Sequence, residues 1–167
     1  ENPIITGESL PEGSSLEDFR DPKVWREDDG YYLVVGSRAK DGSGQILMYY
    51  SEDLNQWEYV TVLEQSKNKY GKMWECPDFF SLGDRQILLV SPQDMRAKGL
   101  EFHNGNNSIF IYGQYEKESH QFKREKVTSA DYGLDFYAAQ TLLTQDGRRI
   151  LIGWMQSWDA NITPASF

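Results

Sequence analysis

The chain has 167 residues, enough for one domain with a substantial hydrophobic core. Its formal charge of −9 and its pI of about 4.7 argue against sequence-independent binding to the phosphate backbone of nucleic acids. No stretch reaches the ~18–20 apolar residues that a membrane-spanning helix needs, so we expect no contact with a membrane. The single cysteine, Cys76, excludes an internal disulfide.

Short apolar runs separated by Gly, Asp and Asn follow one another along the chain. Their length and their β-branched or aromatic residues favour strands over helices. The predicted strands are Tyr31–Val35, Gln45–Tyr50, Glu58–Leu63, Gln86–Val90, Ser108–Tyr112 and Arg149–Trp154. The best candidate for a turn of helix is Asp94–Glu101. We therefore predict an all-β fold.

Clusters flanked by proline or aromatic residues recur along the chain. They contain Asp21, Asp78 and Asp135, which follow one another at intervals of 57 residues. Four antiparallel strands in a unit of about 50 residues are typical of a β-propeller blade, although evenly spaced strands also fit a sandwich. Two complete units and part of a third fit into the chain. Since the inner strand of each blade lines a central channel, a propeller would bring Asp21, Glu75 and Asp135 to one pocket.

Two carboxyl groups could carry hydrolytic chemistry. Cleavage of a glycosidic bond usually needs a pair of carboxyl groups, one of which donates a proton. Glu75 lies among Trp, Cys, Pro and Phe residues, and apolar surroundings favour the protonated form that a general acid needs. Asp21 lies between an arginine and a proline, so we expect it to be ionised and fixed in place. The alternative is that each is an ordinary polar residue at the start of a strand.

Aromatic residues near the third cluster offer surfaces for a sugar. Asp135 is followed closely by Tyr137, which places an acceptor for hydroxyl groups beside an aromatic ring. Trp154 and Trp158 could stack on the apolar face of a sugar, or could pack in the core.

Four motifs occur in a fixed order along the chain. They are Phe19-Arg20-Asp21-Pro22, Trp74-Glu75-Cys76-Pro77-Asp78, Asp135-Phe136-Tyr137-Ala138-Ala139-Gln140-Thr141 and Ile152-Gly153-Trp154-Met155. In this order they resemble the motifs of glycoside hydrolase family 32, the invertases, sucrose-6-phosphate hydrolases and fructanases. The second motif is the most specific, and the resemblance covers essentially the whole chain.

The resemblance implies a partial five-bladed propeller, with this chain forming about blades two to four. It also implies retaining hydrolysis of β-fructofuranosides without a metal or organic cofactor. By this likeness Glu75 is the acid/base catalyst and Asp21 stabilises the transition state. The implied substrate-binding residues are Arg20, Asp135, Tyr137 and Trp154, with Phe136 and Gln140 in the same motif as Tyr137.

The sequence departs from the family at the nucleophile. The family's nucleophilic Asp lies in a Trp-Met-Asn-Asp-Pro-Asn-type motif of the first blade, and this motif, the last blade and the C-terminal β-sandwich have no counterpart here. We therefore expect residues 1–167 to be part of a single catalytic propeller domain and to be inactive alone, because retaining hydrolysis needs its nucleophile. The alternatives are a non-catalytic carbohydrate-binding propeller segment and a related five-bladed arabinan or xylan hydrolase.

The expected partner is a small-molecule sugar substrate rather than nucleic acid. An open arc of blades leaves apolar surface uncovered, which predicts self-association of the isolated chain. The single cysteine and the family likeness favour a cytoplasmic location.

Overall fold

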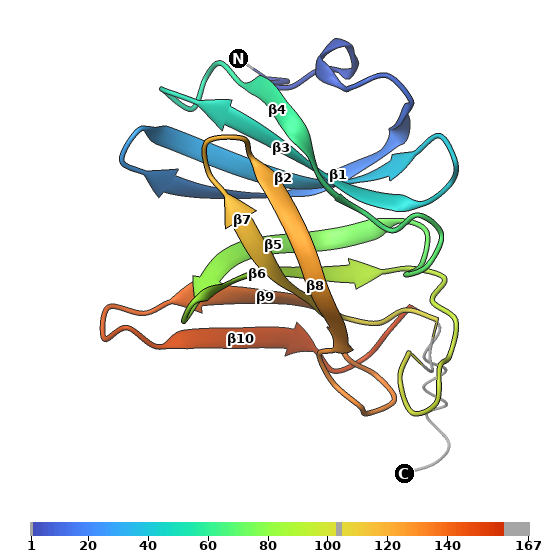
Figure 1. The fold of residues 1–167 in the computed structure, drawn as a ribbon. Coiled ribbons are helices and arrows are strands. Elements are labelled where there is room, and N and C mark those ends of the chain that lie inside the picture. The colour runs from blue at the N-terminus through green and yellow to red at the C-terminus, as the bar shows by residue number, and fades with distance from the viewer. Residues whose placement is uncertain (1, 103–104, 159–167) are drawn as a thin grey trace.

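The computed structural model describes residues 2–102 and 105–158. Antiparallel strands form almost all of their regular structure, and Gly7–Ser9 adds a short 3-10 turn. The first sheet contains β1 (Ser14–Glu27), β2 (Gly30–Ala39), β3 (Gly44–Ser51) and β4 (Glu58–Gln65) (Figure 1). The second contains β5 (Trp74–Leu82), β6 (Arg85–Pro92), β7 (Ile109–Glu116) and β8 (Gln121–Ser129), and in the third β9 (Tyr137–Leu143) pairs with β10 (Arg149–Trp154). Within these ranges, no helix is long and apolar enough to cross a bilayer.

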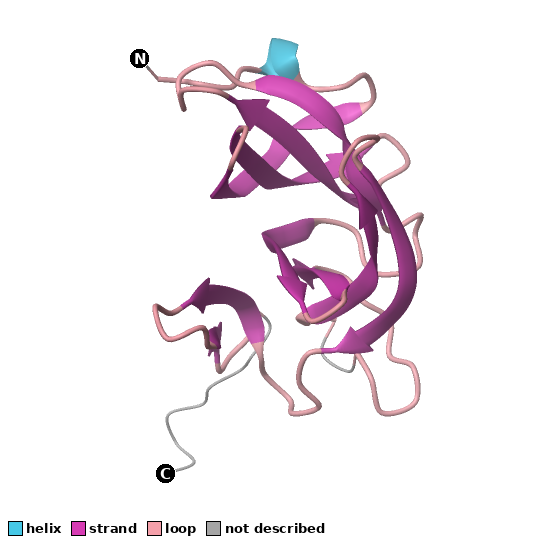
Figure 2. Ribbon diagram, turned by 60° about the vertical axis from the view of Figure 1, so that its left-hand side comes forward, coloured by secondary structure: helices cyan, strands magenta, loops and turns pink. Residues whose placement is uncertain are grey.

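The three sheets follow one another in an arc (Figure 2). The first strand of each sheet is its inner strand, and β5 contacts both β1 and β9. Sheets arranged in this way form a partial β-propeller. The predicted all-β class is confirmed, and so is the division into two complete units and part of a third. The number of blades in a closed propeller stays a prediction.

Apolar side chains between the sheets hold the arc together. The core between the first two sheets includes Val34, Met48, Trp74, Leu88 and Ile109, all fully buried. A smaller core joins the second sheet to the third and contains Phe80, Ile87, Leu89 and Ala139. Because side chains alternate between the two faces of a strand, β6 supplies Leu88 to the first core and Ile87 and Leu89 to the second.

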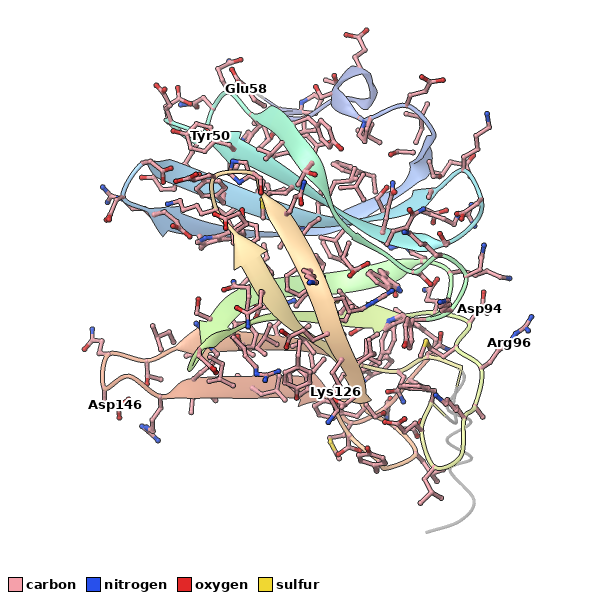
Figure 3. The ribbon with its side chains drawn as sticks, viewed as in Figure 1. Tyr50, Glu58, Asp94, Arg96, Lys126 and Asp146 are labelled. Carbon is pink, nitrogen blue, oxygen red and sulfur yellow. The ribbon has the colours of Figure 1, made fainter. Side chains whose placement is uncertain are left out.

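One sequence expectation, the helical turn at Asp94–Glu101, is wrong. Asp94 has a φ of 56° and Gly99 a φ of 59°, which are incompatible with a right-handed helix. The segment is an irregular loop, in which a bridge between Lys98 and Glu101 closes a tight turn. Figure 3 shows Asp94 and Arg96 at the outer edge of the molecule on this loop.

The even interval of 57 residues is not the structural repeat. Each inner strand has a register shift, and the residue at the shift has a positive φ: 63° at Asp21, 48° at Cys76 and 52° at Ala138. These β-bulges are the equivalent points of the three sheets. Asp78 lies two residues beyond the bulge of β5, so it is not the counterpart of Asp21. Bulges often contain proline because the unpaired residue needs no N–H donor, and Pro22 and Pro77 follow two of these three.

Candidate active site

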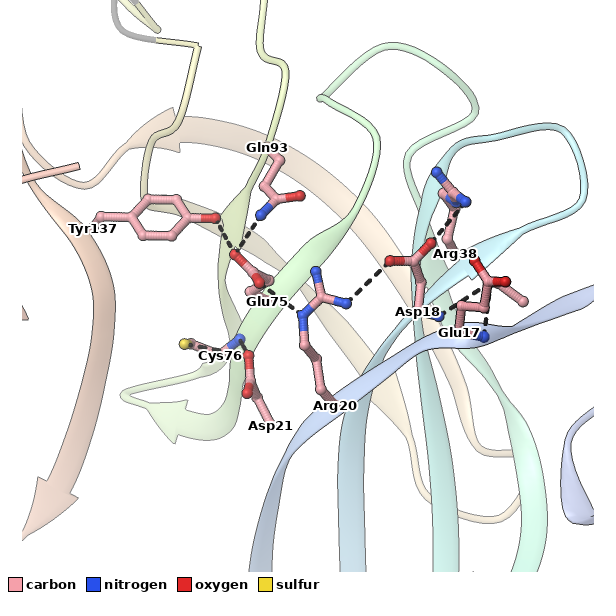
Figure 4. A network of polar contacts seen from close by, with 10 residues as sticks. Glu17, Asp18, Arg20, Asp21, Arg38, Glu75, Cys76, Gln93 and Tyr137 are labelled. Atoms are coloured by element: carbon pink, nitrogen blue, oxygen red, sulfur yellow. Dashed lines mark hydrogen bonds and ion pairs between the residues drawn. The ribbon is translucent and has the colours of Figure 1, made fainter. Parts of the chain in front are cut away.

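The residue before each bulge points its side chain to a common point. These residues are Arg20 on β1, Glu75 on β5 and Tyr137 on β9, which lie far apart in the sequence (Figure 4). Arg20 Nε donates to Glu75 Oε1 at 2.7 Å, and the Tyr137 hydroxyl donates to Glu75 Oε2 at 2.6 Å. The bulges of three neighbouring sheets therefore assemble one polar cluster around a carboxyl group.

Glu75 is buried, with 7% of its surface exposed, and three donors surround its carboxyl group. The third donor is Gln93, whose Nε2 lies 3.0 Å from Glu75 Oε2. The expected burial is present, but the neighbours are polar donors rather than the expected apolar wall. The reason is the local strand geometry: Trp74 alternates with Glu75 and turns into the core between the first two sheets, and the bulge after Glu75 turns Phe79 into the same core.

Asp21 is tied to the residue that follows Glu75. The backbone N–H of Cys76 donates to Asp21 Oδ2 at 3.1 Å, and the Cys76 thiol lies 3.6 Å from the same oxygen. Burial, together with the negative charge of Asp21, raises the pKa of the Cys76 thiol to about 12. Cys76 is therefore a neutral thiol that holds Asp21 in place, not a nucleophile.

Arg20 connects Glu75 to a second carboxylate at the edge of the first sheet. Its Nη1 lies 3.1 Å from Asp18 Oδ1, and Asp18 Oδ2 lies 2.7 Å from Arg38 Nη2. Burial alone would lower the pKa of Arg20, but hydrogen bonds to Glu75 and Asp18 outweigh it and raise that pKa. The guanidinium is thus a fixed cation between two carboxylates (Figure 4).

Hydrogen bonds between side chains and backbone cross-link the three inner strands near the bulges. Gln140 on β9 donates from Nε2 to the Cys76 carbonyl at 2.6 Å, and its Oε1 accepts from Lys23 Nζ at 3.0 Å. The carboxylate of Asp78 accepts from the backbone N–H and the hydroxyl of Thr141 at 2.6 and 2.7 Å. β1, β5 and β9 are therefore cross-linked directly below Asp21 and Glu75.

The remaining predicted residues lie on the third sheet. The Trp154 ring packs edge-on against Trp158, which in turn contacts the Tyr137 ring, so this aromatic group adjoins the Glu75 cluster. Asp135 lies two residues before Tyr137, and its Oδ1 accepts from the Ser157 hydroxyl at 3.2 Å. The structure thus joins Arg20 and Tyr137 to Glu75 by hydrogen bonds, links Asp21 to the adjacent Cys76, and places Trp154 one ring away from Tyr137.

Cavity size alone does not mark the site. A cavity of about 750 Å³ lies toward the opposite ends of the inner strands and is lined by residues such as Trp25, Glu27, Leu82 and Leu143. Neither Glu75 nor Asp21 lines it. The sequence analysis missed Gln93 and Asp18, which no motif includes, and only their contacts reveal them.

Known proteins resemble this chain in sequence and in fold. Residues 1–166 match the model of the glycosyl hydrolases family 32 N-terminal domain. A sucrose-6-phosphate hydrolase of Escherichia coli is 44% identical over 150 residues, which cover 90% of this chain and 31% of that protein. The structure of a Bombyx mori beta-fructofuranosidase of family 32 superposes with a TM-score of 0.88 at 41% identity, over 96% of this chain and 34% of that one. A mutant of that enzyme, in complex with sucrose, superposes with a TM-score of 0.87 at 41% identity, over 96% of this chain and 33% of that one.

The chain thus spans about a third of the length of the relatives that it matches.

Proposed function

The chain belongs to glycoside hydrolase family 32, and from this membership we propose that the full-length protein is a retaining β-fructofuranosidase. Its substrates are sucrose, sucrose 6-phosphate or related fructosides. Residues 1–167 form part of its catalytic propeller and contribute the acid/base catalyst and the transition-state stabiliser. The nucleophile comes from a segment outside this chain, so the 167-residue chain alone is inactive.

The observation that carries the proposal is the pairing of Asp21 and Glu75 across two inner strands. Glu75 is held by three donors, and the next residue along the chain, Cys76, binds Asp21. In retaining glycoside hydrolysis one carboxyl group donates a proton and a second attacks the sugar; Glu75 supplies the first of these, and Asp21 is the fixed carboxylate that stabilises the charge on the sugar. The geometry thus supports catalysis more strongly than binding alone.

In the first step, protonated Glu75 donates its proton to the glycosidic oxygen as the bond to the fructosyl carbon breaks. The external carboxylate attacks that carbon and forms a fructosyl–enzyme ester. Asp21, kept in position by the Cys76 N–H, accepts hydrogen bonds from fructose hydroxyls and stabilises the positive charge that develops on the ring.

In the second step, ionised Glu75 takes a proton from water, and the hydroxide oxygen attacks the fructosyl carbon. The ester breaks, fructose leaves with its configuration retained, and Glu75 is protonated again. The Arg20 cation next to Glu75 stabilises its ionised form between the two steps.

Three residues of the third sheet complete the fructose site in this proposal. Asp135 accepts sugar hydroxyls, and Trp154 offers a ring face for stacking. Tyr137 borders the sugar while its hydroxyl holds Glu75. The sucrose complex of the B. mori relative supports a disaccharide of this class as the ligand.

The test is hydrolysis of sucrose, sucrose 6-phosphate and an aryl arabinoside by the full-length protein, its Glu75→Gln variant and the 167-residue chain. We expect the full-length protein to release fructose, and Glu75→Gln to lose about 10²–10⁴-fold in kcat, which is the contribution of general acid catalysis. Fructoside binding without cleavage would instead support a binding module. Cleavage of the arabinoside alone would support the related hydrolase, and turnover by the 167-residue chain would contradict the external nucleophile.

A further inference from the structure

Gln93 lies just beyond β6 and contacts the carboxyl oxygen of Glu75 that also accepts from Tyr137. We propose that Gln93 is a positioning residue for Glu75, which sets the orientation of its carboxyl group and the pH range over which it can donate a proton. This proposal rests on the proposed function, in which Glu75 is the acid/base catalyst.

The bulge in β5 places Glu75 on the same face of the sheet as Gln93. Between the turn and the bulge, Phe79 pairs with Leu88, and an unbroken register would place Gln93 opposite Trp74. Glu75 would then share the face of Phe79, which points into the core between the first two sheets, whereas Gln93 would still share the face of Ser91. The bulge shifts the pairing by one residue, so that Glu75 lies opposite Ser91 and Gln93 is its diagonal neighbour.

The backbone of Gln93 is fixed to the segment that leads into β5. Its N–H donates to the Met73 carbonyl at 2.9 Å, and its carbonyl accepts from the Lys72 N–H at 2.8 Å. Gly71, with a φ of 70°, packs so closely that a Cβ atom there would lie 2.3 Å from the Gln93 carbonyl oxygen. The backbone of Gln93 is therefore held in place, and its side chain reaches Glu75 diagonally across the pair of strands.

Gln93 differs from the other two donors in its chemistry. Arg20 is a positively charged donor to Glu75 Oε1, whereas Gln93 and Tyr137 are neutral donors that share Glu75 Oε2. A neutral donor fixes the carboxyl plane and favours the ionised carboxylate without adding a charge. Loss of the Gln93 side chain should therefore remove one of the two donors to Glu75 Oε2 and favour the protonated form of Glu75 over the ionised form.

The experiment compares Gln93→Met, Gln93→Glu and the matched control Gln86→Met in the full-length protein. Met keeps the length of the side chain without its donor, and Glu keeps its shape but places a carboxylate beside Glu75. Gln86 lies near the start of β6, at the opposite end from Gln93, where it accepts a hydrogen bond from Ser81.

For Gln93→Met we expect kcat to fall about tenfold with KM within about twofold, the size expected for one lost hydrogen bond to a charged group. The alkaline limb of the pH profile of kcat, which reports the proton on the general acid, should move to higher pH by about one unit. Gln93→Glu should move it further in the same direction, because like charges disfavour ionisation. Gln86→Met should leave both kcat and the profile unchanged.

Equal losses in Gln93→Met and Gln86→Met, or unmoved profiles in both Gln93 variants, would overturn the proposal. If the wild-type protein cleaves no fructoside, the proposed function has failed, and crystal structures of the full-length wild type and Gln93→Met decide the role of Gln93 instead. A rotated or doubly placed Glu75 carboxyl group in Gln93→Met supports positioning. An unmoved carboxyl group contradicts it.

Discussion

Arg20 and Glu75 occupy equivalent places in neighbouring blades, and their side chains meet at 2.7 Å. Each precedes a bulge residue with positive φ, Asp21 in one strand and Cys76 in the other. The same repeat that builds the propeller therefore places a cation in one blade against a carboxyl group in the next. The bulge residue Cys76, in turn, binds the bulge residue Asp21.

Arg20 should be required for activity in the full-length protein. Arg20→Met removes the charged donor to Glu75 and leaves Asp18 with only Arg38, so we expect kcat/KM on sucrose to fall about 30-fold. Steady-state kinetics measure this. Arg85→Met, which breaks an exposed ion pair on the second sheet, is the control and should leave kcat/KM unchanged. Equal rates in the two variants would contradict the role of Arg20.

Tyr137→Phe tests the hydroxyl group separately from the ring. The ring is buried and its packing should survive, but Oε2 of Glu75 loses a donor at 2.6 Å. We expect kcat to fall about tenfold with little change in KM. Burial, followed by the hydrogen bond to Glu75, raises the pKa of Tyr137, so the wild-type profile should show no phenol ionisation below about pH 10. A wild-type ionisation that disappears in Tyr137→Phe would contradict this assignment.

Cys76 should resist alkylation in the folded protein. Burial, with the Asp21 charge, raises its pKa from 9.0 to about 12, so almost no thiolate is present at neutral pH. We expect maleimide to label Cys76 at pH 8 only after unfolding, as mass spectrometry would show. Because the folded-state pKa is the higher one, this contribution to stability is complete below about pH 9 and is lost as the pH rises toward 12. Rapid labelling of the native protein would be the contrary result.

Asp78 should contribute to stability rather than to catalysis directly. Asp78→Ala leaves the Thr141 N–H and hydroxyl without their acceptor and removes the carboxylate near Lys23. We expect the free energy of unfolding to fall by about 3 kcal/mol in urea denaturation of the full-length protein. Asp146→Ala, at the exposed β9–β10 turn, should change it by less than about 0.5 kcal/mol. A similar decrease in the free energy of unfolding in both variants would argue against a stabilising cross-link between the strands at Asp78.

We propose that the isolated 167-residue chain self-associates through the third sheet. Leu142 and Ile152 are 48% and 62% exposed on β9 and β10, on the face where the lining of a shallow groove also includes Trp154. Sedimentation velocity should detect oligomers, and the double variant Leu142→Lys/Ile152→Lys should reduce them. Leu100→Lys, on an exposed loop, is the control and should have no effect. A monodisperse wild-type monomer would contradict this expectation.

Sequence patterns predicted those strands well that are short apolar runs ended by turn residues. Tyr31–Val35 and Gln86–Val90, for example, lie within β2 and β6. The helical turn predicted at Asp94–Glu101 was wrong because local composition did not reveal the positive φ at Asp94. This residue lies in a loop in which the Met95 N–H donates to the Gly105 carbonyl. Patterns of residue type describe regular repeats, whereas such loops depend on contacts with distant parts of the chain.

The order and type of residues were enough to identify the family and the fold class and to predict Asp21 and Glu75 as site residues, because these belong to contiguous motifs. The partners of Glu75 were decided only in three dimensions. Glu75 lies on the same face as Gln93 because the one-residue bulge in β5 places Glu75 and Phe79 on opposite faces of the sheet, although an unbroken strand would place them on the same face. Position along the chain sets which groups are present, but strand register sets which of them meet.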